Sequence, residues 1–529
     1  MVHSRLTSKS LSIVLVFICV ATVSGGSSWA ETPDKSESVG ANNPQFAHVR
    51  SQIESLMLKD QLPSVAVAVA QHGKIVWEQG FGWADREQLR PATSDTLYSL
   101  ASISKPFTAT AIMALVKQGK IRLEAPANDY LGAAKITGLA GDASGVTVYR
   151  LLNHTSGLPL HWQFFYTNED YPLPPMDDTI LRYGNAVNPP GEVYQYSNLG
   201  FGILGYMVSR VSDMSYADAM RMLIFAPLGL THTSVGIGPG LERYAAARYD
   251  SKMRPLPFYT FDHLGASAVY SSAHDLVRFA MFHLKDHLPD QQQILDDETI
   301  DLMHRATTPM DNPKEFYALG FFGTTDEYGF MSIGHDGGMP GVRTVMRLYP
   351  AEDLAVVVLT NCSPSDVAGG KDVISQIEED IVAALLPRYA DTRRAKLNNP
   401  EQPQYYGAER GEPYSPRPGL LGTWSGTVRT WQSTLPLKLV FQPNGDIHVK
   451  LADQFETLLN KPHWQGKMLV GLFPGFIPTP DANRLRHYMR LELWLRNGML
   501  QGEANAEAAD DEPAHYSLSS YVELKRAAQ

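Results

Sequence analysis

A serine and a lysine with catalytic spacing occur together at Ser102-Ile103-Ser104-Lys105. If this segment opens a helix, residues three apart share a face, so the Lys105 amine can reach the Ser102 hydroxyl. A serine hydroxyl is a weak nucleophile until a neighbouring base takes its proton. Lysine serves as that base when burial or nearby positive charge lowers its pKa. The spacing therefore indicates nucleophilic catalysis, although the same residues also fit an N-capping serine followed by a surface lysine.

Two later segments contain side chains that could complete such a site. Tyr194-Gln195-Tyr196-Ser197-Asn198 follows an Asn-Pro-Pro-Gly-Glu turn at 188–192 and precedes a helix-like, glycine-rich stretch. The segment Ile333-Gly334-His335-Asp336-Gly337-Gly338 precedes a predicted strand at 342–349. Both segments thus place polar side chains next to an expected helix or strand.

The expected elements around these segments alternate between strands and helices. A helix over 102–118 has Pro106 in its first turn and Gly119 after its end. Strands are predicted at 64–70 and 74–83, and a strand pair at 342–349 and 354–360. Amphipathic helices are predicted over 46–57 and 372–386, and residues 121–255 mix short helices with loops. This pattern predicts an α+β fold in which distant segments share one sheet.

Taken in chain order, the three segments resemble the motifs of the serine β-lactamase and penicillin-binding-protein-like superfamily, nearest its class C branch of peptidases and esterases. The corresponding motifs are Ser102-x-x-Lys105, Tyr196-x-Asn198 and His335-x-Gly337. Residues 153–159, 265–267 and 275–276 are also similar to connecting segments of that family. The likeness covers residues 43–388 and implies an antiparallel sheet flanked by helices plus an all-helical subdomain.

Two other segments have the same spacing as the second and third motifs. They are Tyr166-Thr167-Asn168 and His263-Leu264-Gly265. We prefer Tyr196 with Asn198 because the preceding turn and the following helix match the family context. We prefer His335 because a predicted strand pair follows it, so its backbone could edge an active-site groove.

The resemblance also implies a mechanism. Ser102 would attack a carbonyl to form an acyl-enzyme, and Lys105 and Tyr196 would share the proton transfers. Asn198 would orient the lysine and contact substrate. The backbone N–H groups of Ser102 and Gly338 would form the oxyanion hole, and water would release the acyl group. No metal ion or cofactor is expected.

The third motif departs from the penicillin-recognising members of the family, which have Lys-Thr-Gly there. In this chain His335, Gly337 and Gly338 would contact substrate, and a neutral imidazole is a poor anchor for an anionic β-lactam or D-Ala-D-Ala terminus. We therefore expect an esterase, amidase or D-aminopeptidase type of activity on a small ester, peptide or amide. The alternatives are a β-lactamase or D-Ala-D-Ala carboxypeptidase of the same fold, and a sensor or wall-binding protein that is acylated without turnover.

The C-terminal part has a different character. Four prolines interrupt the polar stretch 389–417, which is predicted to be a linker. Hairpin signals at 435–451 and 488–498 predict a small antiparallel β-barrel over 418–527. Together with Gly422-Thr423-Trp424, these hairpins resemble the lipocalin-like domains of some D-aminopeptidases. Such a domain could hold a ligand, lie beside the catalytic cleft or support oligomers.

The N-terminus and the composition bear on location and partners. Arg5 and Lys9 precede an apolar run at 11–23 and small residues at 28 and 30, which predicts a secretory signal peptide over 1–30, cleaved after Ala30. We expect a periplasmic or secreted protein without stable membrane insertion. The net charge of −11 gives no electrostatic reason to expect nucleic acid, and two cysteines are too few for a disulfide framework or a multi-cysteine zinc site.

Overall fold

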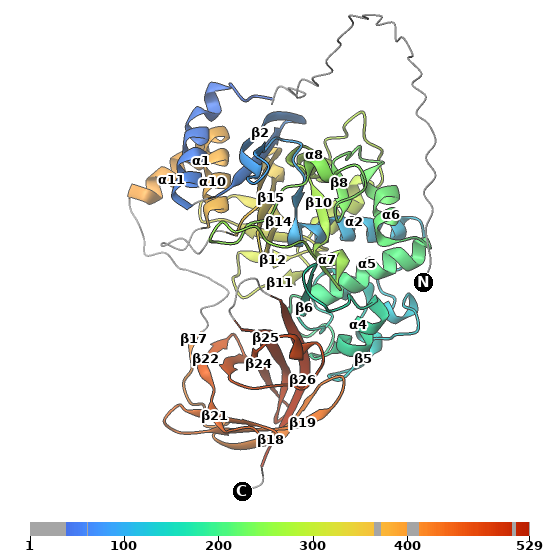
Figure 1. Cartoon of the computed structure of the whole chain (residues 1–529), viewed down its shortest axis with the longest axis vertical. Helices are drawn as coiled ribbons and strands as arrows, with labels where there is room; N and C mark the ends of the chain where they lie inside the picture. Colours follow the sequence, from blue (N-terminus) through green and yellow to red (C-terminus); the bar gives the residue numbers. More distant parts are fainter. Residues whose placement is uncertain (1–38, 61, 364–371, 399–411, 510–514, 528–529) are drawn as a thin grey trace, which may run out of the picture. The chain divides into compact units, whose positions relative to one another are not determined.

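The computed structural model describes residues 39–60, 62–363, 372–398, 412–509 and 515–527 (Figure 1). The predicted signal peptide, 1–30, lies outside the described residues. Residues 38–529 form one compact unit. Among the helices of the described ranges, none has the length and apolar character needed to cross a bilayer.

A nine-stranded antiparallel sheet forms the centre of the N-terminal domain. Its spatial order is β11-β12-β13-β14-β15-β16-β1-β2-β3, so the first strands of the chain pair with the last strands of the domain. The predicted α+β fold is confirmed. The strands are β1 (Ser64–Gln71), β2 (Lys74–Asp85), β3 (Arg90–Pro91), β11 (Thr308–Pro309), β12 (Glu315–Tyr317), β13 (Phe322–Thr325), β14 (Met331–Met339), β15 (Val342–Tyr349) and β16 (Leu354–Thr360).

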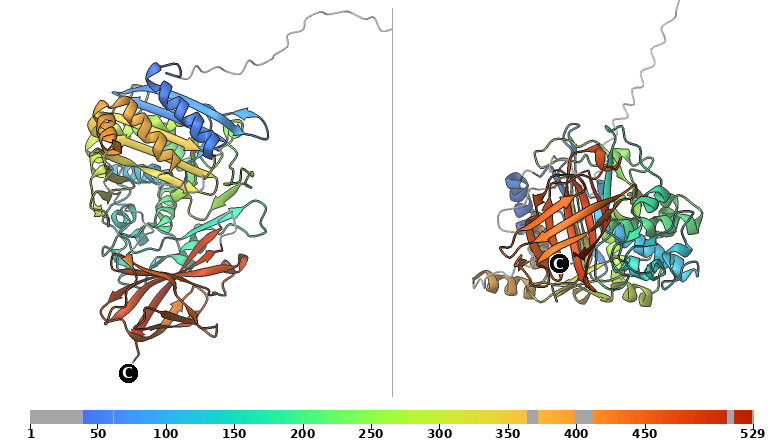
Figure 2. Two further views of the ribbon diagram at one scale, coloured as in Figure 1. Left: turned by 90° about the vertical axis from the view of Figure 1, so that its left-hand side faces the viewer. Right: turned by 90° about the horizontal axis from the view of Figure 1, so that it is seen from below.

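Both faces of this sheet are covered by helices, and the sequence of β1 reflects this. Its valines at 65, 67 and 69 pack in one core cluster and its alanines at 66, 68 and 70 in the other, as the period of two requires. The valine face lies against α1 (Ala47–Asp60) and α10 (Val373–Leu385), which Figure 2 shows across one side of the sheet. The small alanine side chains let α8 (Ala273–Leu284) approach the other face.

A helical subdomain packs beside α8 and α2 (Ser104–Lys117). Its helices are α3 (Val148–Leu152), α4 (Met176–Tyr183), α5 (Asn198–Ser212), α6 (Tyr216–Met220) and α7 (Leu264–Ser267). Two short strands, β6 (Trp162–Tyr166) and β9 (Tyr259–Phe261), pair with each other within this part of the chain. The subdomain is therefore mainly, but not wholly, helical.

The stretch predicted to be a linker begins with a helix. Helix α11 (Pro387–Asn398) covers its first ten residues and packs against α10. Arg393 forms ion pairs with Glu379 and Asp380 of α10, and Tyr389 is buried. One buried aromatic and a charge network are enough to hold a helix that has no apolar period of its own.

The C-terminal domain is a curled antiparallel sheet, a half-barrel rather than the predicted small barrel. The predicted hairpins are present: β19 pairs with β20, and β24 with β25. The likeness to lipocalins stays a prediction. The main strands are β18 (Gly422–Arg429), β19 (Thr434–Phe441), β20 (Ile447–Leu451), β22 (Asn460–Gln465), β23 (Met468–Phe473), β24 (His487–Arg496), β25 (Met499–Ala508) and β26 (Tyr516–Arg526).

The C-terminal domain contacts the helical subdomain through a buried carboxylate in the segment between β23 and β24. Asp481 is fully buried and accepts hydrogen bonds from the Tyr171 hydroxyl at 2.7 Å and from the Tyr183 hydroxyl. It also pairs with Arg182 at 3.2 Å. Strand β26 extends this contact by pairing with β6. The segment that leads to Tyr196 is therefore tied to the C-terminal domain.

Replacing Asp481 with alanine should lower the free energy of unfolding by about 3 kcal/mol, because it leaves Arg182 without its buried partner. Urea denaturation followed by fluorescence measures this change. The control is Asp453→Ala, an exposed acid of the same domain, which should change the free energy by no more than about 0.5 kcal/mol. Equal effects of the two substitutions would contradict a stabilising role for Asp481.

Candidate active site

Ser102 lies in a 3₁₀ turn, Ala101–Ile103, directly before α2. The turn is fixed from two sides: the Leu100 N–H donates to the Val269 carbonyl at 2.9 Å, and the Thr344 hydroxyl donates to the Leu100 carbonyl at 3.0 Å. Ala101 has a φ of +49°, a backbone conformation that residues other than glycine rarely adopt. Strain of this kind, held in place by surrounding contacts, is typical of functional positions.

The Lys105 side chain is completely buried beneath Ser102. Its amine lies 3.1 Å from Ser102 Oγ, 2.9 Å from Asn198 Oδ1 and 3.2 Å from the Ala266 carbonyl oxygen. All three partners are uncharged, and burial lowers the pKa of Lys105 well below its usual value. A neutral amine has two hydrogens, which Asn198 and Ala266 can accept, and its lone pair then faces the Ser102 hydroxyl.

Tyr196 covers the lysine from above. Its ring centroid lies 4.7 Å from the Lys105 amine. Burial raises the pKa of the Tyr196 phenol, although a hydrogen bond with Ser102 opposes this shift. The phenol is therefore protonated near neutral pH and can donate a proton.

The helix that follows Tyr196 is well anchored. Ser197 caps α5, because its hydroxyl accepts from the Gly200 N–H at 2.9 Å and donates to the Pro159 carbonyl at 2.6 Å. Asn198, the first residue of α5, donates its backbone N–H to the Leu160 carbonyl at 2.9 Å. These bonds fix the direction in which the Asn198 side chain meets the lysine.

A histidine that we did not single out from the sequence lies under Tyr196. His154 is completely buried, with its ring centroid 4.4 Å from that of Tyr196. Its Nδ1 accepts from the Ser197 N–H at 3.1 Å. Burial, and next the charge of Lys105, lower the pKa of His154 well below its usual value. His154 lies in the 153–159 segment of the family likeness, and this was the only sequence signal for it.

The third predicted motif lies on β14, beside the nucleophile turn. His335 Nδ1 lies 2.7 Å from the Asp336 carbonyl, and Nε2 lies 3.1 Å from the Tyr317 hydroxyl. Burial, and next the charge of Lys105, lower the pKa of His335 to about 3. The imidazole is therefore neutral, donating from Nδ1 and accepting at Nε2.

The residues on either side of His335 along β14 have different environments. The Asp336 carboxylate pairs with Arg347 at 2.6 Å. Because successive side chains of a strand point to opposite faces of the sheet, Asp336 lies on the face opposite to that of His335. At Gly337 a Cβ would lie 2.1 Å from the Leu100 carbonyl oxygen, so only glycine allows β14 to approach the turn. Gly338 follows and is exposed.

The two alternative motifs lie elsewhere. Tyr166 belongs to β6 and packs against Tyr259 and His515 at centroid distances of 4.9 Å. His263 belongs to a buried cluster with His161 and Asp262, the three side chains that could hold a metal ion by their types and proximity. In this structure they hydrogen-bond to one another. The structure thus brings Ser102, Lys105, Tyr196 and Asn198 together without either alternative.

The C-terminal domain also reaches the second motif. Gln195, next to Tyr196, donates to the buried Glu503 of β25 at 2.5 Å and accepts from the Asn188 side-chain amide. Arg496 of β24 pairs with Glu192 at 2.6 Å. The loop that carries Tyr196 is therefore held by side chains of a second domain.

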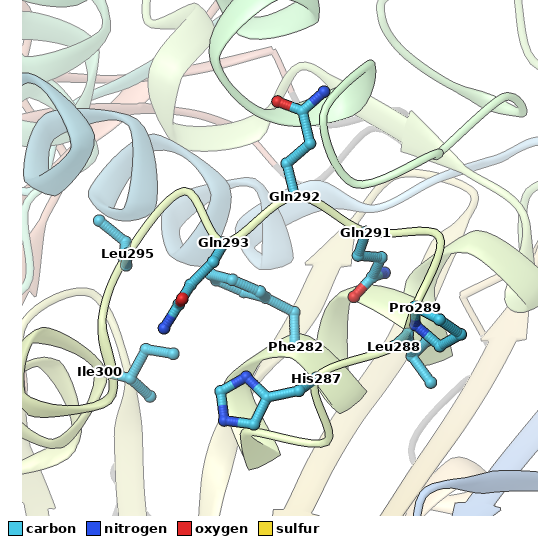
Figure 3. A pocket seen from close by; sticks show the side chains of 9 residues that line it. All are labelled: Phe282, His287, Leu288, Pro289, Gln291, Gln292, Gln293, Leu295 and Ile300. Atoms are coloured by element: carbon cyan, nitrogen blue, oxygen red, sulfur yellow. The ribbon is translucent and has the colours of Figure 1, made fainter.

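Two surface cavities are lined by residues other than those of the candidate active site. One, of about 270 Å³, lies at the end of α8 and is lined by Phe282, Leu288, Leu295 and Ile300 together with glutamines and His287 (Figure 3). The other, of about 400 Å³, is lined by residues of β2, β3 and the 237–258 segment. Side-chain geometry rather than cavity size therefore identifies the candidate active site.

Comparison with known proteins agrees with this geometry. The family model described as Beta-lactamase matches residues 49–378. Penicillin-binding protein 4 of Amycolatopsis lactamdurans is 29% identical over 72% of this chain and 97% of its own length. Penicillin-binding protein 4* of Bacillus subtilis is 30% identical over 59% of this chain and 71% of its own length.

Solved structures show the same fold. The octameric penicillin-binding protein homologue from Pyrococcus abyssi has a TM-score of 0.55 at 20% identity and covers 89% of this chain and 99% of its own. A class C beta-lactamase has a TM-score of 0.55 at 20% identity and covers 65% of this chain and 96% of its own. With a family match over more than half of its length, the chain belongs to the Beta-lactamase family, whose members are serine hydrolases.

Proposed function

We propose that this protein is an exported serine hydrolase that forms an acyl-enzyme on Ser102 with a small ester, peptide or amide. The observation that supports this most strongly is the buried Lys105 amine, 3.1 Å from Ser102 Oγ and surrounded by uncharged partners. Such an amine is poised as a general base at ordinary pH. Export is part of the proposal because of the charged and apolar N-terminal segment.

In the proposed reaction, Ser102 Oγ bonds to the substrate carbonyl carbon while its proton passes to the Lys105 amine. The Tyr196 phenol protonates the leaving group as its bond to the carbonyl carbon breaks, and Lys105 returns a proton to Tyr196. The Ser102 and Gly338 N–H groups stabilise the oxyanion. Water then attacks the acyl-enzyme by the same proton path in reverse, and Asn198 keeps Lys105 in position.

The preferred substrates are uncharged at the position that His335 faces. A neutral imidazole that is already bonded to Tyr317 and to a backbone carbonyl does not supply the fixed cation that attracts a substrate carboxylate. This favours an ester or amide over an anionic β-lactam or a D-Ala-D-Ala terminus.

The kcat/KM for nitrocefin should be about 10- to 150-fold below that for p-nitrophenyl butyrate, since one missing charged hydrogen bond is worth about 1.5–3 kcal/mol. Hydrolysis of the two compounds is followed by absorbance on the same enzyme preparation. If nitrocefin is hydrolysed as fast as the ester and Ser102→Ala abolishes this activity, the result would support Ser102 as the nucleophile and contradict the proposed substrate preference.

Mass spectrometry of Ser102 after exposure to p-nitrophenyl esters, D-amino acid anilides and β-lactams tests the proposal as a whole. Esters or anilides should load acyl groups onto the peptide that contains Ser102 and release them within the assay. Adducts that form and persist with every compound would favour the acylated sensor instead. No adduct with any compound would contradict the hydrolase.

A further inference from the structure

A cluster of three charged or titratable side chains lies beneath the candidate active site. His161, Asp262 and His263 have fully buried side chains. Asp262 Oδ2 lies 2.8 Å from His161 Nε2, and Oδ1 lies 2.7 Å from His263 Nδ1. The Thr179 hydroxyl of α4 donates to Oδ2 at 3.3 Å. Both carboxylate oxygens therefore accept hydrogen bonds, although the cluster is not part of the proposed reaction.

The carboxylate is the charged centre of this cluster. Burial alone would raise the pKa of Asp262, but the charge and hydrogen bonds of His161, followed by those of His263, hold it below its usual range. Removing one partner of a buried charged group costs far more than removing a surface contact. The two histidines are therefore held firmly against Asp262.

Backbone hydrogen bonds connect the cluster to the two oxygens that accept hydrogen bonds from Lys105, which are Asn198 Oδ1 and the Ala266 carbonyl. His161 follows Leu160, whose carbonyl accepts the Asn198 N–H at 2.9 Å, and the Asn198 side chain accepts from the lysine. On the other side, the His263 carbonyl accepts the Ala266 N–H at 2.9 Å and so opens α7. The Ala266 carbonyl is the second oxygen bonded to the lysine.

Close packing transmits this arrangement to the active site. A Cβ at Gly202 of α5 would lie 2.8 Å from the His263 Cβ, and one at Gly205 would lie 2.8 Å from the Gly265 Cα. The two helices, α5 and α7, lie side by side in Figure 1 and touch through these glycines. A shift of His263 would therefore move α7 against α5 and change the spacing of the two oxygens.

We propose that Asp262 is a positioning residue, which ties the 160–161 and 262–266 segments together and so keeps the Lys105 amine against Ser102. This inference rests on the function proposed above. It assigns a role to the His263-Leu264-Gly265 segment that is separate from substrate contact.

The test compares the rate at which a fluorophosphonate probe labels Ser102 in four full-length proteins, at a temperature where thermal unfolding shows each to be folded. Asp262→Ala should label about 100-fold more slowly than wild type, as expected for a misplacement of about 1 Å. Asp262→Asn should stay within about threefold of wild type, because an amide can accept from one histidine and donate to the other. His283→Gln is the control.

The control removes a buried histidine that contacts Thr110 of α2 at 3.1 Å, away from the lysine. It should lower the melting temperature without changing the labelling rate. If Asp262→Ala does not fold, His161→Asn takes its place, because asparagine tolerates the positive φ of +41° but is too short to reach the carboxylate. Its rate should fall about tenfold. A folded Asp262→Ala or His161→Asn protein that labels at the wild-type rate would overturn the positioning role.

Two further readouts do not depend on any reaction. In crystals of Asp262→Ala, the Ala266 carbonyl should move from the Lys105 amine by about 1 Å, and an unchanged position would overturn the inference. If the probe does not label the wild-type protein, the proposed function is contradicted. The distance between the Ala266 carbonyl and the Lys105 amine in the crystals then tests the positioning role by itself.

Zinc analysis of the purified protein should find well below about one ion per chain. If the wild-type protein contains one zinc per chain and Asp262→Ala loses it, the three residues form a metal site and the positioning role is overturned.

Discussion

Replacing Lys105 with methionine should slow the acylation of Ser102 by about 10³-fold, within the range that a positioned general base contributes. Methionine has nearly the same length and needs no hydrogen bonds, so it suits a fully buried position. The Tyr196 phenol then still hydrogen-bonds to Ser102, but its raised pKa keeps it protonated, so it cannot take the serine proton. The pre-steady-state burst of p-nitrophenol from an ester substrate measures the acylation rate.

A second lysine of the same helix provides the control. Lys117 lies in the last turn of α2 and its side chain is 43% exposed. Lys117→Met should acylate at the wild-type rate. Equal rates for Lys105→Met and wild type would show that another group takes the Ser102 proton.

Replacing Ser102 with alanine should remove the covalent adduct entirely and lower kcat/KM on the order of 10⁵-fold, because hydrolysis then proceeds without the nucleophile. Intact-protein mass spectrometry after exposure to a fluorophosphonate detects the adduct. The residual rate reports binding and the oxyanion-stabilising N–H groups alone.

Ser104→Ala is the matched control, two residues along the chain. The Ser104 hydroxyl is buried and accepts from the Val269 N–H at 2.9 Å, so its loss should cost about 1 kcal/mol of stability while leaving the adduct intact. An adduct of unchanged mass in Ser102→Ala would place the nucleophile on another residue.

The local part of this site could be predicted from the sequence, because its geometry is local. Ser102 and Lys105 are one helical turn apart, and any helix beginning at that point brings the two side chains together. Two strands of the central sheet could be predicted equally well: β15 and β16 have the predicted bounds. Their apolar period and flanking turn residues determine these bounds without long-range information.

Contacts between distant segments of the chain could not be predicted from the sequence in this way. The nearness of Asn198 to Lys105 was inferred from the family likeness. The Ala266 residue lies in the 265–267 segment of the family likeness, but the bond of its carbonyl to the lysine could not be predicted, since a backbone oxygen carries no residue type. His154 was similarly hidden, because burial against Tyr196 depends on how α3 and α5 pack. The helix α11 was missed because charged contacts with α10 hold it, rather than an apolar stripe.

The pH dependence of the rate at which a fluorophosphonate labels Ser102 tests most directly whether a neutral Lys105 amine activates it. The probe does not titrate, so the rate reports the enzyme alone. Because only the deprotonated amine can take the serine proton, the rate should fall as the pH falls through the lowered pKa of Lys105. We expect the rate to level off well below pH 10.5, the usual lysine value, and to lose this dependence in Lys105→Met. A rate that still rises at pH 10.5, or an unchanged profile in Lys105→Met, would contradict the account.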